Sequence, residues 1–395
     1  MGTKQYDSAT DLITFSRASS ATFLGSNGLL QTAANNVPRI EYDATGAVKG
    51  LLIEEARTNL LSYSGAVTST GWNVSALNVS AVTAGSPFGS YQSASPPSTA
   101  STEGQAYQIG KPLTSGATYV AWSLAKYSAG NGWFSVSHYN AGGVGGGNQR
   151  GWFDLQNGVV GSKDTTIIDH GMIDYGDGWW LCWASKNAES TSGGINLGLT
   201  TGDGVFQGRH SGDVILIAGS QFEAGAFPTS YIPTTGAAAT RARDLAEIPT
   251  SAFGYNNDAG SLVIDVLTPV ADQLMTLAIF NTFTYNESRS LWKSNSAFNA
   301  TGDYFLFHSH DGLTTMFTMG QQTQAGYTKL GLSYGDSEKA VRDGGTVISG
   351  TSRSPSPTRL LLGGRDDGYQ SQCWIKSIQY YPRRLTDTQL QELTT

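Results

Sequence analysis

Three aromatic residues, Trp133, Tyr139 and Trp152, flank a glycine-rich run at positions 142–147, and their chemistry suggests a ligand site. Glycine lets a ligand approach the backbone closely, although such a run also suits a loop tip with no role. The faces of Trp and Tyr rings stack on the apolar C–H faces of sugars, so exposed aromatic side chains on a sheet would form a glycan platform. Most Trp residues of a β-domain are simply core. The apolar residues after Trp152 favour burial there, whereas the glycine before Trp133 favours exposure.

Two other groups have the residue types of metal ligands. Asp366 and Asp367 lie in a turn-rich stretch at 363–368, where carboxylates and carbonyls would suit a structural calcium ion, although turn composition alone also explains them. His308 and His310 would share one face of a strand and present two nitrogens to a metal, without an obvious third ligand. A structural calcium ion is therefore the one cofactor that the sequence suggests.

No familiar catalytic motif occurs in the sequence. It lacks a P-loop, a Rossmann glycine pattern, a zinc-binding HExxH motif and a nucleophile elbow. A glycan-cleaving enzyme needs two carboxylates that converge in a cleft, or a Tyr, His and Arg set for lyase chemistry, and no spacing links such residues here. We therefore expect no catalytic residues, while an active site assembled from distant strands stays open.

Composition excludes several classes of partner. The 395 residues are 14% charged, include 49 glycines and carry a net charge of −7 without a Lys or Arg cluster, so we expect no nucleic-acid partner. No run of about 18 apolar residues exists, so we expect no membrane insertion. The stretch MGTKQYDSATDL lacks the apolar core of a signal peptide, which predicts synthesis and assembly in a cytoplasm. The length suggests two or three domains.

Short alternating runs between turns predict an all-β chain. In residues 117–126, Val120, Trp122 and Leu124 would face one side of a half-buried strand. Six strands of a first β-sandwich are predicted at 117–126, 132–139, 151–155, 179–185, 195–200 and 214–222, and about nine strands of a second follow residue 258.

Local signals within these elements predict two further features. Thr386 and Gln389 form a capping box, which predicts a short helix at the end of the second sandwich. Cys182 and Cys373 lie beside Trp residues in predicted strands of different sandwiches. We expect both to be buried free thiols.

Two stretches resemble a recurring signature of virion structural proteins of tailed bacteriophages. One lies within residues 14–64 and includes Arg17-Ala18-Ser19, Pro38-Arg39-Ile40, Gly50-Leu51-Leu52-Ile53-Glu54 and Arg57-Thr58-Asn59-Leu60. The other lies within 219–244 and includes Gln221-Phe222-Glu223-Ala224-Gly225, Thr229-Ser230-Tyr231-Ile232-Pro233-Thr234 and Thr240-Arg241-Ala242. The phrase Asp177-Gly178-Trp179-Trp180-Leu181 is similar to a strand of the jelly rolls in those proteins. The late strands, with Leu361-Leu362-Gly363-Gly364, resemble a laminin-G or concanavalin-A-like sandwich.

These resemblances imply four parts. They are an N-terminal attachment and oligomerisation segment at 1–64, a carbohydrate-binding-module-like jelly roll at 65–227, a linker at 228–257, and a laminin-G or concanavalin-A-like sandwich with a short helix at 258–395. The fold class is thus two consecutive antiparallel β-sandwiches preceded by an irregular β-rich segment. Arg17, Arg39 and Arg57 would dock the segment on the particle or on sister subunits, or would simply be solvated charges.

The implied function is that of a fibre, spike or head-fibre subunit of a virion. Its partners would be other virion proteins and host cell-surface polysaccharide, with binding but no cleavage. We expect a homo-oligomer, in particular a trimer, because the N-terminal segment has too little apolar surface to fold alone. Two alternatives remain: a virion-associated polysaccharide depolymerase, and a purely architectural cement protein.

Overall fold

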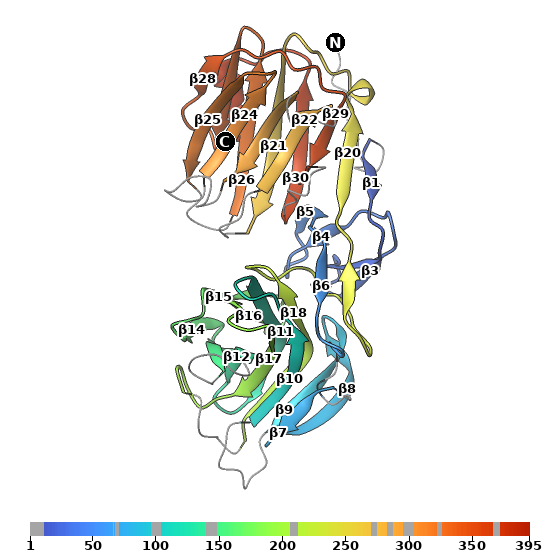
Figure 1. The fold of residues 1–395 in the computed structure, drawn as a ribbon, viewed down its shortest axis with the longest axis vertical. Helices are drawn as coiled ribbons and strands as arrows, with labels where there is room; N and C mark the ends of the chain where they lie inside the picture. The colour runs from blue at the N-terminus through green and yellow to red at the C-terminus, as the bar shows by residue number, and fades with distance from the viewer. Residues whose placement is uncertain are drawn as a thin grey trace.

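The computed structural model describes residues 12–395 except for 66, 68–70, 96–103, 140–147, 206–211, 270–274, 283–286, 295–303, 322–325 and 366–371. Within them the chain forms two antiparallel β-sandwiches with strands of the N-terminal segment between them (Figure 1). The predicted all-β class is confirmed. No helix in the described residues is long and apolar enough to cross a membrane.

The first sandwich consists of two six-stranded sheets. Sheet I has the order β14 (Val159–Lys163), β13 (Gln149–Asp154), β12 (Trp133–Tyr139), β17 (Ser192–Leu199), β10 (Gly104–Pro112), β7 (Asn73–Ser75). Sheet II has the order β15 (Asp169–Asp174), β16 (Trp179–Asn187), β11 (Thr118–Ala129), β18 (Val214–Ala224), β9 (Gly89–Ser95), β8 (Asn78–Ser86). Alternate residues of both sheets, such as Phe134, Val136 and Phe222, form one core between them.

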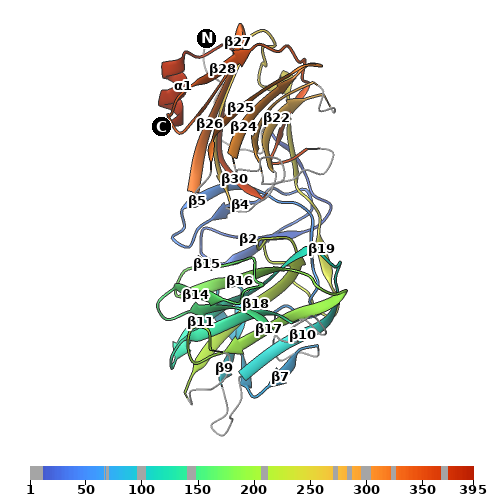
Figure 2. The same cartoon turned by 60° about the vertical axis from the view of Figure 1, so that its left-hand side comes forward.

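The second sandwich consists of two seven-stranded sheets. Sheet III has the order β1 (Thr14–Ser16), β20 (Leu245–Pro249), β29 (Arg359–Leu362), β22 (Met275–Asn281), β23 (Ser288–Lys293), β24 (Tyr304–His310), β25 (Thr314–Gln321). Sheet IV has the order β28 (Ile348–Thr351), β27 (Ser337–Arg342), β26 (Gly326–Tyr334), β21 (Gly260–Thr268), β30 (Cys373–Tyr381), β5 (Val48–Ile53), β4 (Ile40–Tyr42). The helix α1 (Asp387–Thr394) lies beside β26 and β27 (Figure 2).

The predicted boundaries made the N-terminal segment a separate part of the chain. In the structure several of its strands instead join the sheets of the second sandwich. Strand β1 extends sheet III, β4 and β5 extend sheet IV beside β30, and β6 (Arg57–Asn59) pairs with β19 (Ala239–Arg241). A hairpin of β2 (Ala21–Leu24) and β3 (Leu30–Ala33) completes the segment. The predicted linker at 228–257 likewise contributes β19, β20 and a 3₁₀ turn at Thr250–Ala252. The surface that the segment needs in order to fold therefore belongs to its own chain.

Five charged side chains, which we call the junction network, fasten this segment. Asp244 accepts hydrogen bonds from Arg17 (Nη1 to Oδ1, 3.1 Å) and Arg39 (Nη2 to Oδ2, 2.6 Å). Glu54 binds Arg39 at 2.8 Å and Arg241 at 3.0 Å, and all five side chains are at most 1% exposed. Because Arg is planar and offers five donors, one guanidinium can bridge both carboxylates.

The predicted docking role of Arg17, Arg39 and Arg57 is wrong, because all three side chains are buried within the chain. Arg57 is 8% exposed, and its guanidinium binds Glu55 at 2.6 Å. Gly225, at φ +134°, leaves room for that guanidinium, because a Cβ there would overlap it. The three arginines are thus buried and paired inside the chain, and none of them forms an attachment surface.

Two local predictions are confirmed. The helix α1 begins at Thr386 with the complete capping box, and Leu385 and Leu390 pack with Val341 beneath it. Cys182 and Cys373 are buried and unbonded, and burial raises the pKa of both thiols. A helix cap and the burial of a strand residue are determined by residues close in the sequence, so both can be predicted from the sequence alone.

Replacement of Asp244 by Ala should destabilise the protein strongly. The substitution removes the carboxylate that Arg17 and Arg39 share and leaves both guanidiniums buried. Breaking a buried ion pair in this way lowers the free energy of unfolding by about 3–5 kcal/mol. The control is Asp336→Ala, which removes an exposed carboxylate 3.8 Å from Arg384 and should cost at most about 0.5 kcal/mol. Urea unfolding of both variants measures the difference, and equal losses would contradict the structural role of the network.

Stability should also fall in acid because of Glu54. Burial by itself would raise the pKa of this carboxyl, but the charges of Arg241 and Arg39 and hydrogen bonds from Ser230 lower it to about 2. The contribution of Glu54 is therefore present above the unfolded pKa of about 4.5 and is lost as the pH falls toward 2, a change on the order of 3 kcal/mol. Chemical unfolding at stepped pH, with NMR titration of ¹³C-labelled Glu, measures it. A Glu54 signal that titrates above pH 4 would show that the pairing is absent.

Candidate functional site

The three predicted ligand-binding aromatics lie on one face of sheet I. Phe134 and Val136 of β12 point into the sandwich core, so the alternate residues of that strand point away from it. Trp152 of β13 joins them, because its register partner on β12 is Ser135. We call this surface the outer face, and its residues on β12 are Trp133, Ser135, Ser137 and Tyr139.

Trp152 and Trp133 lie in different environments on the outer face. Trp152 is 2% exposed, and its indole Nε1 donates to the Val205 carbonyl at 3.1 Å. Trp133 is half-buried and lies over β14, where a Cβ at Gly161 would come within 2.7 Å of its Cζ3 atom. Trp152 is therefore part of the packed structure, as its sequence context favours, while Trp133 keeps part of its ring exposed.

Tyr139 stands at the opposite end of β12. Its ring stacks on that of Tyr107 from β10, with centroids 5.7 Å apart and planes inclined by 9°. Tyr139 lies six positions after Trp133, so the two aromatic ends of the outer face are about 20 Å apart along the strand. Both tyrosines are half-buried.

Polar atoms without a partner lie between the two aromatic ends. The buried atoms Ser135 Oγ, Ser137 Oγ, Asn196 Oδ1 and Thr200 Oγ1 make no hydrogen bond among the described residues. The registers place them together, since β17 sets Asn196 opposite Ser137 and Gly198 opposite Ser135. The Oδ1 atom of Asn148, which directly precedes β13, is likewise unpartnered there.

Such a row of unpartnered atoms is unusual in a protein interior. A buried polar group without a hydrogen bond costs about 1–3 kcal/mol, and most buried side-chain polar atoms have a partner. Hydroxyl groups both donate and accept, so the row matches a ligand that carries several hydroxyls of its own. The outer face thus combines buried, unpartnered polar atoms between its ends with partly exposed aromatic side chains at each end.

The carboxylates at the Trp133 end are structural. Asp203 accepts hydrogen bonds from the Ser162 N–H and hydroxyl, at 2.7 and 2.8 Å. Asp154 accepts from the backbone N–H groups of Gln156 and Asn157 at 3.1 Å. Asp154 therefore fixes the turn after β13, and Asp203 ties its own segment to β14.

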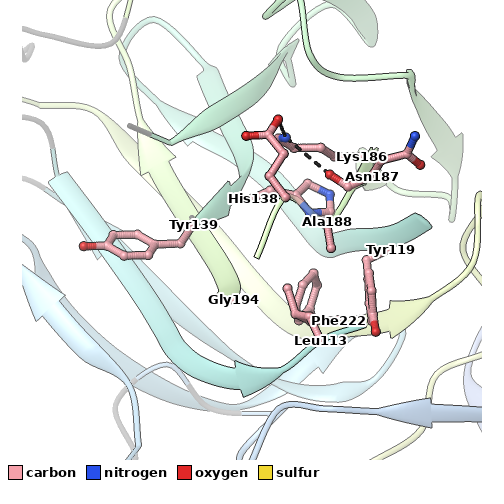
Figure 3. Close-up of a pocket in the computed structure, with 10 residues that line it drawn as sticks. Leu113, Tyr119, His138, Tyr139, Lys186, Asn187, Ala188, Gly194 and Phe222 are labelled. Atoms are coloured by element: carbon pink, nitrogen blue, oxygen red, sulfur yellow. Dashed lines mark hydrogen bonds and ion pairs between the residues drawn. The ribbon is translucent and has the colours of Figure 1, made fainter. Parts of the chain in front are cut away.

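The small pocket beside Tyr139 cannot hold a ligand. Its free volume is about 10 Å³, about that of one water molecule, and its walls include Tyr119, His138 and Phe222. In Figure 3 the Tyr139 ring points away from the His138 imidazole. Burial lowers the pKa of His138 to about 4, and its Nε2 bonds to the Ala184 carbonyl at 2.9 Å. This histidine is a neutral core residue.

A wider hollow of about 380 Å³ lies where the N-terminal segment meets the first sandwich. Ala56, Leu60, Pro112 and Ala224 give it mainly apolar walls. Its charged group, Arg57, is already occupied by Glu55. The hollow therefore offers less for recognition than the outer face.

The predicted metal sites receive no support from the described residues. Asp366 and Asp367, with the calcium ion expected there, lie outside the described residues. The His308 and His310 rings stack with centroids 6.0 Å apart, and burial, with the charges of His310 and Arg365, lowers the pKa of His308 to about 4. No group of three or more His, Cys, Asp or Glu that could hold a metal occurs in the part of the chain that the structure describes.

Sequence reasoning missed the polar residues of the outer face. Strand alternation in GWFSVSHY already sets Ser135 and Ser137 on the side of Trp133 and Tyr139, and this signal was available. Asn196, Thr200 and Tyr107 join the face only through the pairing of β12, β17 and β10. Such register is a tertiary property and leaves no mark in the spacing of these residues.

Comparison with known proteins found no matching family model and no matching curated protein. Among solved structures, the chain is similar to the CBM40 of the Ruminococcus gnavus IT-sialidase, with 16% identity, 37% of this chain and 87% of that chain covered, and a TM-score of 0.31. It is also similar to Trypanosoma rangeli sialidase in complex with the inhibitor DANA (9% identity, 78% and 66% covered, TM-score 0.30). A third is the N-terminal CBM22-1-CBM22-2 tandem domain of Paenibacillus barcinonensis Xyn10C (10% identity, 84% and 98% covered, TM-score 0.25). Likeness at this level assigns neither a family nor a ligand.

The two tryptophans should respond differently to truncation. Trp152→Ala should lower the free energy of unfolding by about 3–5 kcal/mol, because the indole is almost fully buried. Trp133→Ala should cost at most about 2 kcal/mol, since only part of its ring is removed from water. Urea unfolding of the two variants makes the comparison. Equal losses would place Trp133 in the core and remove it from the outer face.

Proposed function

We propose that this protein adheres to glycans through the outer face of its first sandwich and does not cleave them. The observation that carries the proposal is the row of unpartnered polar atoms from Thr200 to Asn148 between the exposed parts of Trp133 and Tyr139. Few ligands other than saccharides offer closely spaced hydroxyls together with apolar C–H faces.

The geometry suggests how binding would proceed. Ser135, Ser137 and Asn196 are at most 1% exposed, so a sugar reaches them once the side chains that cover them move aside. Their oxygens then gain the partners that they lack in the free protein. Sugar units at the two ends stack on Trp133 and on the Tyr107–Tyr139 pair. Because these side chains project from paired strands, their backbone is held by the sheet, and only side chains have to rearrange on binding.

We also propose that the protein is a virion subunit of a tailed bacteriophage, a fibre, spike or head fibre, which presents the outer face to host cell-surface polysaccharide. The resemblance of residues 14–64 and 219–244 supports this proposal. Assembly would take place in the host cytoplasm, with the finished protein at the virion surface. The surface that attaches it to other virion proteins excludes the buried Arg17, Arg39 and Arg57.

A trimer remains our proposal for the oligomeric state, but its support has changed. The N-terminal segment was expected to need sister subunits for burial, and it packs instead on its own sheets III and IV. The remaining support is the resemblance to virion fibres and the preference of repeated subunits for closed cyclic assembly. Light scattering of the full chain distinguishes a trimer from a monomer.

The two alternative functions, a depolymerase and a cement protein, can each be distinguished from adhesion in a binding experiment with host polysaccharide. A depolymerase would release new reducing ends or unsaturated products. An architectural cement protein would bind no saccharide on a broad glycan array. Saturable binding without product supports adhesion.

Ser137→Ala should weaken glycan binding without loss of stability. The hydroxyl has no partner among the described residues, so its removal should leave the free energy of unfolding unchanged or raise it by up to about 1 kcal/mol, while affinity falls about three- to tenfold. The matched control is Ser123→Ala, a buried serine of sheet II whose hydroxyl donates to the Gly219 carbonyl at 3.1 Å. It should cost about 1 kcal/mol of stability and leave affinity unchanged. Urea unfolding and calorimetric titration with the glycan bound on an array give both values. Unchanged affinity of the Ser137 variant would remove this part of the site.

A further inference from the structure

A second cluster with unused polar capacity lies on the second sandwich, on the surface of sheet IV that faces away from the core. Leu262, Ile264 and Val266 of β21 point inward, so Asp265 and Leu267 point outward. The helix α1 covers part of this surface, over Val341 and Gly331. The part near β30 and β5 is left uncovered by the helix (Figure 2).

Asp265 is the centre of this cluster. Its register partners are Lys329 on β26 and Ser377 on β30. Its Oδ1 atom is buried and has no hydrogen-bond partner among the described residues. Burial raises the pKa of Asp265 although Lys376 and Lys329 favour the charged form. A half-buried carboxylate in this state has unused capacity to accept hydrogen bonds.

The neighbouring lysines are engaged elsewhere. Lys329 Nζ donates to the Thr395 carbonyl at 2.7 Å. The Lys376 ammonium lies 4.7 Å from the centroid of the Tyr327 ring. Among the described residues, Asp265 forms an ion pair with neither lysine. Both nevertheless remain near enough to donate to a ligand that Asp265 binds.

Two aromatic side chains flank Leu267 next to Asp265. Tyr327 and Trp374 are the register partners of Leu267 on β26 and β30. Tyr327 is 41% exposed, and its hydroxyl donates to the Lys49 carbonyl at 2.9 Å. The Trp374 indole Nε1 donates to Glu41, and the Lys49 ammonium lies 3.7 Å from the ring centroid. Both rings are therefore fixed in place before any ligand arrives.

We propose that Asp265, Tyr327, Trp374 and Lys376 form a second saccharide site, for a neutral, hydroxyl-rich unit. Charge selects the ligand class. A cation would meet Lys49, Lys329 and Lys376, and an anion would meet Asp265 and Glu41. A sugar hydroxyl, in contrast, donates to the carboxylate and accepts from an ammonium at once, while Leu267 and the exposed part of Tyr327 suit C–H faces.

This site is independent of the outer face of sheet I, and together they would make one chain bivalent. Once one site holds a polysaccharide, the other meets the same polymer at a high effective concentration. Bivalent attachment then exceeds either single affinity by a factor of about 10²–10⁴ where the spacing permits both contacts.

The test uses the full chain labelled with ¹⁵N-Trp, with the Trp374 Nε1–H signal as reporter. The probes are neutral gluco-, galacto-, manno- and N-acetylhexosamine oligosaccharides, with uronic-acid and sialylated ones as the acidic set. Trp374→Phe assigns the signal. We expect at least one neutral probe to shift it, with the dissociation constant raised at least tenfold in Asp265→Asn and unchanged in the control Asp336→Asn, an exposed carboxylate of the same sandwich.

Different results overturn the proposal. A Trp374 signal that no neutral probe moves, that moves only with acidic probes, or that moves equally in Asp265→Asn excludes a neutral saccharide at this site. If Asp265→Asn does not fold, Ser377→Trp replaces it, because this exposed partner of Asp265 on β30 would fill the same space. Ser137→Ala should leave the shift intact, and a shift lost in Ser137→Ala but kept in Asp265→Asn would assign all binding to sheet I.

Discussion

The arrangement of the two sandwiches depends on the junction network. In this network Glu54 and Asp244 form buried ion pairs with three guanidinium groups. Taking these charges out of water is expensive, and apolar side chains of the same volume would often give similar or greater stability. Ion pairs add geometric specificity, because a guanidinium that donates two hydrogen bonds tolerates only a few arrangements of its partners. Arg17, Arg39 and Arg241 come from three separate stretches of the chain, so pairing them fixes how those stretches cross. We infer that the network is retained for specificity of the fold.

The stretch at 219–244 has a role in this arrangement that explains its composition. Gln221 accepts from the Ile232 N–H, and Glu223 accepts from the Thr229 N–H and hydroxyl. Ser230 donates its N–H to Glu54 at 2.8 Å, and Tyr231 stacks on Phe88 with centroids 4.6 Å apart. A proline-containing segment without regular structure must satisfy its buried backbone groups through side chains, and the polar residues of the signature supply those partners.

This packing also determines which face of the first sandwich is free for a ligand. Trp122 and Leu124 of β11 were expected on one side of a half-buried strand, but Tyr231 and Leu30 pack on that side, so both faces of the strand are buried. The outward face of sheet II is therefore occupied by the chain itself. Sheet I has no such cover from the N-terminal segment. On this sheet Trp133 and Tyr139 keep part of their rings exposed, while the unpartnered oxygens of Ser135 and Ser137 lie buried between them.

Prediction from the sequence succeeded where a few neighbouring residues decide the structure. The strand predicted at 214–222 is observed as Val214–Ala224, and the capping box of Thr386 needs only its own turn. Alternation within β12 also puts Trp133 and Tyr139 on one face, a local signal that was available but unused. The junction network could not be predicted in this way, since Arg17 and Asp244 are 227 positions apart and both look like surface charges in their local context. The same limit applies to Asn196, which reaches the outer face only through strand pairing.

The short joint between the sandwiches bears on how the two proposed saccharide sites would act together. Flexible linkers let two modules meet almost any spacing on a ligand, at the cost of a lower effective concentration. Here β5 belongs to sheet IV, and the chain continues directly into β6, whose Asn59 binds the Ile232 carbonyl at 2.9 Å beside the first sandwich. The distance and angle between the outer face and the Asp265 cluster are therefore set by folding. A polysaccharide would gain from both proposed sites only if its repeat matched that geometry, so the joint would then contribute to the choice of glycan.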